Sequence, residues 1–253
     1  MSSKNSISII EDEIRIDRKE WPRSAITTFR EDYYEELSSV TWTLKNGYLH
    51  NTKFGYLHRY VMRKWYGETL FSHMTQHNWV VDHMNGNKMD CRISNLEFLP
   101  IRYNVAKGQT IDVDSERLRM HIALTLCKDF TTGYYQIHIG CNDDISLYDV
   151  TQHRIICHLA RISFLYNLDY QLVISDAISI LLNYKFSKKI NISTLQCIDW
   201  KAEPTVAIAL RENEIGQPII ARNGSLYANI GNGIWFYSSG VEKGWAPKHL
   251  THS

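Results

Sequence analysis

The sequence predicts an α+β protein, and three observations support that class. Apolar residues make up 44% of the 253 residues and aromatic residues 12%, which is typical of a folded chain. Residues 79–108 contain two short apolar runs, a polar loop between them and a helical pattern after the second run. Residues 191–253 alternate apolar and polar side chains, as strands do. We therefore expect a small core of two strands and a helix, with mixed α/β and C-terminal β-rich regions added to it.

The first 39 residues predict an arm followed by a helix. Residues 1–16 have the composition of a mobile or weakly strand-forming arm. A helix is expected from about Pro22 to Leu37, because a proline near the start of a helix loses no intrahelical hydrogen bond. The arm has no basic region and its apolar stretch is short, so no secretory signal is expected.

Residues 40–67 predict a hairpin and then a short helix. Asn46-Gly47 separates two apolar and aromatic runs, and both residues tolerate the positive φ of a tight hairpin turn. Residues 56–66 have the spacing of an amphipathic helix, and Gly67 favours the end of that helix.

Residues 79–108 predict the central unit of the chain. Gly86 can adopt the positive φ that a turn in the polar loop requires, and Pro100 is placed to open the helix. The expected order is a strand at residues 79–81, a loop at 84–88, a second strand at 96–99 and a helix at 101–107.

The C-terminal part of the chain predicts a linker, a mixed region and a β-rich region. Residues 109–115 are polar and suit a linker. Strands are expected at residues 134–140 and 145–150, and helices at 154–168 and 175–186. Turns are expected at Asn223-Gly224 and at residues 231–233. These patterns divide the chain into residues 1–39, 40–110, 111–190 and 191–253, with soft boundaries near 110 and 190.

The net charge of +1 hides an uneven distribution along the chain. Residues 1–39 carry six Lys and Arg against nine Asp and Glu, and residues 111–253 carry thirteen against fourteen. Residues 40–110 carry nine against four, with five histidines besides. A local excess of positive charge suits a phosphate backbone even on a near-neutral protein, so the distribution favours a nucleic-acid partner.

The cysteines and the hydropathy indicate a reducing, aqueous environment. The five cysteines lie far apart and form no CxxC pair, so we expect reduced thiols and neither a disulfide framework nor a structural zinc site. They are Cys91, Cys127, Cys141, Cys157 and Cys197. Nowhere do eighteen apolar residues run together, so no membrane span is expected. A cytoplasmic protein is the expectation.

Four side chains of the central unit suit metal-assisted hydrolysis of a phosphodiester bond. Asp82 offers a carboxylate oxygen and Asn104 an amide oxygen, the ligands that a hard ion such as Mg²⁺ prefers. His83 points to the other side of an extended strand, where it can take a proton from the attacking water. Asn95 can hold the loop through hydrogen bonds to backbone groups.

These residues resemble the HNH family of nucleases with the ββα-metal fold, and especially the phage and intron-encoded homing type. The matching residues are Asp82-His83, Asn85-Gly86-Asn87-Lys88, Asn95-Leu96 and Asn104. Leu57-His58-Arg59 is similar to the lead-in of these proteins, so the resemblance covers residues 40–108 at most. It implies that His83 is the general base, that Asn95 is structural and that Asp82 and Asn104 bind one divalent cation, Mg²⁺ or alternatively Mn²⁺.

Further basic residues around the motif are weaker candidates for contacts with DNA. They are His58, Arg59, Lys88, Arg92, Arg102 and Lys107. The alternatives are that His58 packs beneath the hairpin and that the others are ordinary solvated side chains. C-terminal aromatic residues such as Trp235 and Trp245 could stack on bases, but the buried face of a hairpin is the favoured interpretation.

The sequence therefore predicts a metal-dependent endonuclease that nicks or cuts double-stranded DNA, in the style of a homing or mobile-element enzyme. A restriction or defence nuclease would use the same core. A DNA-binding regulatory protein with an inactive core is the alternative from another class. The chain is expected to act as a monomer or homodimer, and the target sequence cannot be predicted.

Overall fold

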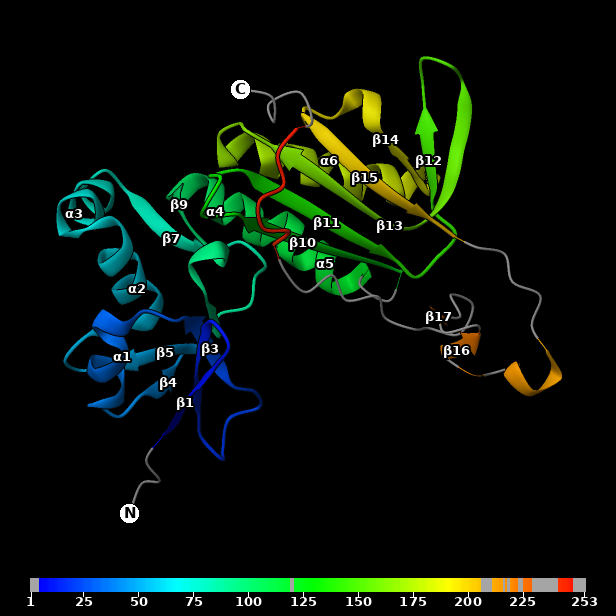
Figure 1. Ribbon diagram of the computed structural model, residues 1–253. Helices are drawn as coiled ribbons and strands as arrows, with labels where there is room; N and C mark the ends of the chain where they lie inside the picture. Colours follow the sequence, from blue (N-terminus) through cyan, green and yellow to red (C-terminus); the bar gives the residue numbers. More distant parts are fainter. Residues whose placement is uncertain are drawn as a thin grey trace. The chain divides into compact units, whose positions relative to one another are not determined.

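The computed structural model describes residues 5–118, 121–205, 211–215, 217, 219–222, 225–228 and 241–247. The chain divides into two compact units, Met1–Val105 and Ala106–Ser253. Each unit is considered by itself (Figure 1). No helix among the described residues is long and apolar enough to cross a membrane.

The first unit begins with a four-stranded sheet. Its strands are β1 (Ser6–Ile10), β2 (Glu13–Asp17), β3 (Ala25–Thr28) and β8 (Asp90–Cys91). The first three pair antiparallel, and β8 adds to β3 in parallel. The sheet thus joins the N-terminal residues to the loop of the predicted site.

The helix predicted from about Pro22 is wrong in its first half. Residues 25–28 form β3, and α1 (Glu31–Ser38) begins only afterwards. The physical reason is tertiary: Ala25 and Thr27 alternate with more exposed neighbours and are fully buried in the sheet. The weakly strand-forming arm is likewise an ordered hairpin from residue 6 onward.

The predicted hairpin and helix of residues 40–67 are confirmed. Strands β4 (Thr43–Lys45) and β5 (Tyr48–Asn51) pair antiparallel around Asn46 and Gly47, whose φ angles are 55° and 82°. A short strand β6 (Gly55–Tyr56) follows, and α2 (Leu57–Tyr66) ends at Gly67. Helix α3 (Glu68–Gln76), which was not predicted, leads to residues 79–108.

Residues 79–108 have the predicted order of elements. Strand β7 (Trp79–His83) pairs antiparallel with β9 (Leu96–Pro100), and α4 (Ile101–Lys107) follows directly. The loop between the strands contains β8 and a 3-10 turn, η1 (Ile93–Asn95), neither of which was predicted. A hydrophobic core drawn from α1, α2, β8 and β9 supports these strands, with Tyr33, Trp42 and Leu57 among its fully buried residues.

The second unit contains a six-stranded sheet with one long helix, α6 (Tyr170–Ser187), packed against it (Figure 1). Its strands are β10 (Ile122–Lys128), β11 (Tyr135–Cys141), β12 (Ser146–Asp149), β13 (Arg154–Tyr166), β14 (Lys189–Asn191) and β15 (Asp199–Pro204). The β12–β14 and β13–β15 pairs cross position 190, where the sequence placed a soft boundary.

Two predictions for this unit are wrong. Residues 154–168 were expected to be helical, but β13 spans most of them, because β11, β12 and β15 pair along it and bury residues 162–166 on both faces. A continuous apolar run does not distinguish such a strand from a helix. The linker expected at residues 109–115 is helical, formed by η2 (Gly108–Asp112) and α5 (Val113–Leu118), because buried Ile111 anchors it.

The remaining elements are short. They are η3 (Ile192–Thr194), η4 (Glu212–Glu214) and the antiparallel pair β16 (Ile219–Arg222) and β17 (Ser225–Ala228). The turns predicted at Asn223-Gly224 and at residues 231–233, like Trp235, lie outside the described residues. Trp245 is buried and donates a hydrogen bond from Nε1 to Asp199 at 3.0 Å, so it does not present its ring to solvent.

Candidate active site

Strand β7 delivers Asp82 and His83 at its C-terminal end. In the β7–β9 register Asp82 lies opposite Glu97 and His83 opposite Leu96. Because successive side chains of a strand point to opposite faces, Asp82 and His83 project to different sides of the sheet. Both are buried, with 6% and 5% of their surfaces exposed.

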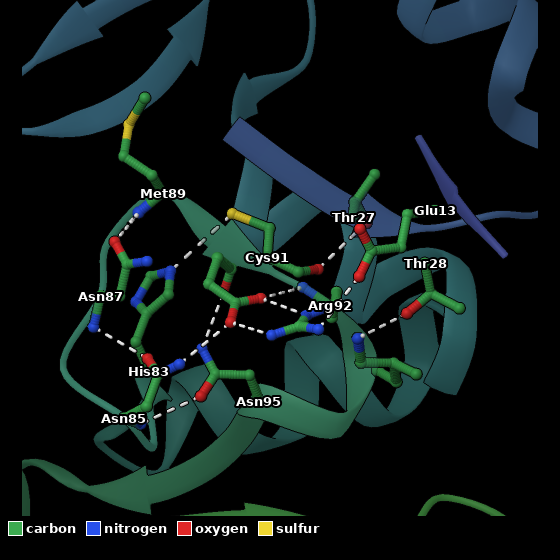
Figure 2. A network of polar contacts seen from close by, with 12 residues as sticks. Glu13, Thr27, Thr28, His83, Asn85, Asn87, Met89, Cys91, Arg92 and Asn95 are labelled. Carbon is green, nitrogen blue, oxygen red and sulfur yellow. Dashed lines mark hydrogen bonds and ion pairs between the residues drawn. The ribbon is translucent and has the colours of Figure 1, made fainter. Parts of the chain in front are cut away.

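Asn95 ties the loop between the two strands together (Figure 2). Its Oδ1 accepts a hydrogen bond from the Asn85 backbone N–H at 3.0 Å, and its Nδ2 donates to the Asp90 carbonyl oxygen at 2.7 Å. Its own carbonyl oxygen accepts from the Met84 N–H at 2.8 Å. One buried side chain thus joins the start and the end of the loop, just beyond His83.

The Asn-Gly-Asn sequence closes the loop locally. Asn85 Oδ1 accepts from the Asn87 N–H at 2.9 Å, and Asn87 Oδ1 accepts from the Met89 N–H at 3.2 Å. Gly86, with a φ of 73°, donates its N–H to the His83 carbonyl oxygen at 2.8 Å. These turns keep the backbone after His83 in one conformation.

The imidazole of His83 lies among a thiol and two rings. Its Nε2 is 3.8 Å from the sulfur of Cys91. The His58 ring stands edge-on to it with centroids 5.0 Å apart and an interplanar angle of 68°. The Tyr48 ring lies 5.7 Å away at 44°. The hairpin β4–β5 and helix α2 therefore both contribute to the surroundings of this histidine.

His58 is a buried, neutral neighbour of His83. Its side chain is 8% exposed, and its Nδ1 has no hydrogen-bond partner among the described residues. Burial, with the positive charges of His83 and Arg59 adding to it, lowers the pKa of His58 from 6.5 to about 2. The expectation that His58 contacts phosphate is thus corrected in favour of packing beneath the hairpin, because its ring contacts Tyr48 and Tyr56.

The two oxygen donors expected at a metal are a carboxylate at the end of β7 and an amide on α4. Asp82 is buried and Asn104 half-buried. The chemistry of this pair fits a hard divalent ion that keeps several waters. In the part of the chain that the structure describes, this site included, no three His, Cys, Asp or Glu side chains form a group that could hold a metal ion.

The basic residues near the motif fall into two groups. Arg59, Lys88 and Arg102 are exposed, and each lies over an aromatic ring: Phe71, Tyr48 and Tyr103 respectively. The cationic side chains themselves are exposed, so they are accessible to a polyanion. Arg59, Lys88 and Arg102 therefore remain candidates for contacts with a phosphate backbone.

Arg92 and Lys107 are committed to carboxylates. Arg92 forms ion pairs with Asp90 at 2.6 Å and with Glu13 at 3.0 Å, and its hydrogen bonds to Asp90 raise the pKa of its guanidinium. Lys107 is 1% exposed at its side chain and pairs with Asp112 at 2.8 Å. The expectation that they contact DNA is therefore corrected: Arg92 fastens the loop to the N-terminal hairpin, and Lys107 is removed from solvent.

Cys91 is the neighbour of the site that sequence reasoning missed. It was interpreted only as a buried thiol, and no spacing signal connects it with His83 eight residues earlier. Its position follows from the β3–β8 pairing, in which Cys91 lies opposite Thr27. All five cysteines are free thiols.

The comparison with known families bears on the segment that contains these residues. Residues 55–106 match the family described as HNH endonuclease. The matched segment contains α2, α3, β7, the loop, β9 and most of α4. A comparison with curated proteins gave no match, and a comparison with solved structures gave none either. Residues 55–106 of the chain therefore belong to the HNH endonuclease family.

Proposed function

We propose that this protein is a metal-dependent endonuclease that hydrolyses phosphodiester bonds of double-stranded DNA. The observation that carries the proposal is the pair Asp82 and His83 at the end of β7, beside a loop that Asn95 holds in one conformation. A buried carboxylate and a buried imidazole on opposite faces of one strand end suit separate roles in one reaction.

In the proposed mechanism His83 accepts the proton of the attacking water, because a neutral imidazole carries a nitrogen lone pair that can act as a general base. Asp82 and Asn104 would hold one divalent cation, Mg²⁺ in preference to Mn²⁺, which would neutralise charge on the scissile phosphate and on the departing 3′ oxygen. Asn95 keeps β7 and β9 in register around the two functional side chains. Arg59, Lys88 and Arg102 would bind the DNA backbone.

The finer proposal is an enzyme of the homing or mobile-element type. It is supported by the Leu57-His58-Arg59 lead-in and by the Asn-Gly-Asn-Lys loop, which resemble that branch of the family. One such centre cuts one strand, so a monomer would nick and a dimer could cut both strands. Mapping the cleaved ends on a plasmid distinguishes a sequence-specific enzyme from a broad defence nuclease.

The test is cleavage of supercoiled plasmid with Mg²⁺ or Mn²⁺, with and without EDTA. We expect nicked or linear product that EDTA abolishes. His83→Ala should remove cleavage while DNA retardation in gels stays nearly unchanged, and the exposed His73→Ala variant is the matched control. Retardation without cleavage under either metal would instead support a DNA-binding protein with an inactive core. Full cleavage by His83→Ala would refute the role of His83.

A further inference from the structure

One aromatic ring of the first unit contacts both the proposed base and a cation. The ring of Tyr48, on β5, lies 5.7 Å from the imidazole of His83, measured between the centroids. The Nζ atom of Lys88 lies 4.6 Å from the centroid of the same Tyr48 ring. The ammonium and the imidazole centroid are therefore separated by no more than the sum of these two distances. The cation and the proposed base belong to one site, and Tyr48 joins them.

The stem and the backbone of Lys88 are held as well. The stem lies against the turn of the β4–β5 hairpin, because a Cβ built on Gly47 would lie 3.4 Å from Lys88 Cδ. The backbone belongs to a closed turn, in which Asn87 Oδ1 accepts a hydrogen bond from the Met89 N–H at 3.2 Å (Figure 2). The loop thus fixes where the lysine begins, and the hairpin fixes the direction of its side chain.

The charge of Lys88 is available to an anion. The side chain is exposed, and in the part of the chain that the structure describes it forms no ion pair, whereas Arg92 and Lys107 are paired with carboxylates. An ammonium carries three hydrogen-bond donors, and a ring beneath it uses only one side of the group. In a complex with DNA, the anion that meets such a cation is a backbone phosphate.

We infer that Lys88 binds the phosphate whose bond is cut, and that Tyr48 is the positioning residue that holds the ammonium there. This inference rests on the proposed function, because it places the phosphate relative to His83 as the base. The phosphate that is cut must lie next to the imidazole, within the short distance that separates it from the Lys88 ammonium. Negative charge builds up on this phosphate as the bond breaks, so a fixed cation stabilises the transition state more than the bound substrate.

The first measurement is the kinetics of plasmid cleavage by Lys88→Met, which keeps an unbranched side chain at an exposed position and removes the charge. We expect kcat to fall about tenfold or more, beyond any change in KM. The matched control is Lys189→Met in the second unit, where the lysine lies at the same 4.6 Å over the ring of Tyr148, and kcat should be unchanged. A loss confined to KM, or equal losses of kcat in both variants, would overturn the role of Lys88.

The second measurement separates positioning of Lys88 from packing against His83. Tyr48→Leu should lower kcat about 2- to 5-fold, because the ring no longer holds the ammonium, and Tyr48→Phe, which keeps the ring, should stay near wild type. In the Lys88→Met background, Tyr48→Leu should cause almost no further loss, since there is no ammonium left to hold. The same loss in both backgrounds would show that the ring only packs against His83, and it would overturn the positioning role.

A binding measurement in EDTA lets the two proposals fail separately. The affinity for a fluorescent duplex is measured against salt concentration, and we expect the slope of log affinity on log salt to be smaller by about 0.9 in Lys88→Met. If wild type cleaves DNA and Lys88→Met keeps both its kcat and the wild-type slope, the inference fails and the proposed function stands. If wild type does not cleave, the proposed function fails, and the slope alone decides whether Lys88 binds a phosphate.

Discussion

At the scale of single residues, the loop after β7 depends on amide side chains that replace backbone partners. The Asn95 side chain accepts a hydrogen bond from the Asn85 N–H and donates one to the Asp90 carbonyl oxygen. Buried backbone groups that lose such a partner cost free energy, so the asparagine stabilises this loop more than its small size suggests. The other asparagine of the predicted site, Asn104, lies half-buried on α4.

This contrast predicts that one asparagine substitution lowers stability and that the other lowers cleavage. Asn95→Ala should lower the free energy of unfolding by about 1–3 kcal/mol, because it leaves buried backbone groups without hydrogen bonds. Asn104→Ala should change it by less than about 0.5 kcal/mol but sharply reduce cleavage at limiting Mg²⁺, with partial recovery at excess Mg²⁺. Urea denaturation and plasmid cleavage measure the two effects, and equal destabilisation by both variants would contradict this assignment.

At the scale of elements, the β4–β5 hairpin matters because it places Tyr48 beside His83. Its turn uses Asn46 and Gly47, both with positive φ. A Cβ at Gly47 would lie 3.4 Å from Lys88 Cδ, an ordinary contact with a flexible side chain. The requirement for glycine is therefore one of backbone conformation and not of space.

Gly47→Ala should lower the free energy of unfolding by about 1 kcal/mol, since an L side chain is strained at this φ. Gly47→Asn should cost less, because asparagine tolerates the left-handed region. Gly108→Ala is the control: Gly108 lies in a helical segment with nothing within 4 Å of the added Cβ, so stability should be unchanged or about 0.5 kcal/mol higher. Equal losses at the two glycines would disprove the conformational explanation.

At the scale of the whole molecule, each compact unit contains a histidine whose pKa burial lowers. Burial lowers the pKa of His58 in the first unit from 6.5 to about 2 and that of His138 in the second from 6.5 to about 4. His138 forms hydrogen bonds with Ser163 at 2.7 Å and Gln136 at 2.8 Å, whereas His58 Nδ1 has no partner in the part of the chain that the structure describes.

These pKa shifts predict that acid destabilises both units. Below pH 6.5 these histidines bind protons in the unfolded chain but stay neutral in the native protein. Their contribution to the free energy of unfolding is therefore complete above pH 6.5. The contribution of His138 is lost as the pH falls toward 4, and that of His58 as the pH falls toward 2. The slope per histidine reaches at most about 1.4 kcal/mol per pH unit. Urea titrations at pH 7.5 and 5.0 measure the difference.

His58→Phe tests the contribution of the first unit. It keeps a ring of similar shape and removes the unpartnered nitrogen, so stability at pH 7.5 should be unchanged or about 1 kcal/mol higher, and the loss at pH 5.0 should be smaller than in wild type. The exposed His73→Phe variant should keep the wild-type loss. An identical pH dependence in all three proteins would show that His58 does not contribute.

The sequence was most informative where local chemistry decides structure. Asn46-Gly47 predicted the hairpin, Gly67 the end of α2, and Pro100 the junction of β9 and α4, because positive φ and a missing N–H are properties of the residues themselves. The motif from Asp82 to Asn104 pointed to the family that residues 55–106 match. Its residue roles stay predictions that the variants above test.

Only the tertiary structure decided the features that depend on distant partners. β13 is a strand and not the predicted helix because three neighbouring strands pair along it, and β3 replaces half of a predicted helix because β2 and β8 flank it. The same β3–β8 pairing brings the Cys91 sulfur to His83, and α2 brings His58 there. The sequence by itself thus determined the turns and the chemically active motif, which are local. The surroundings of the proposed base were set by packing between distant segments, such as Thr27 and Cys91, which are 64 residues apart, and no local pattern encodes such contacts.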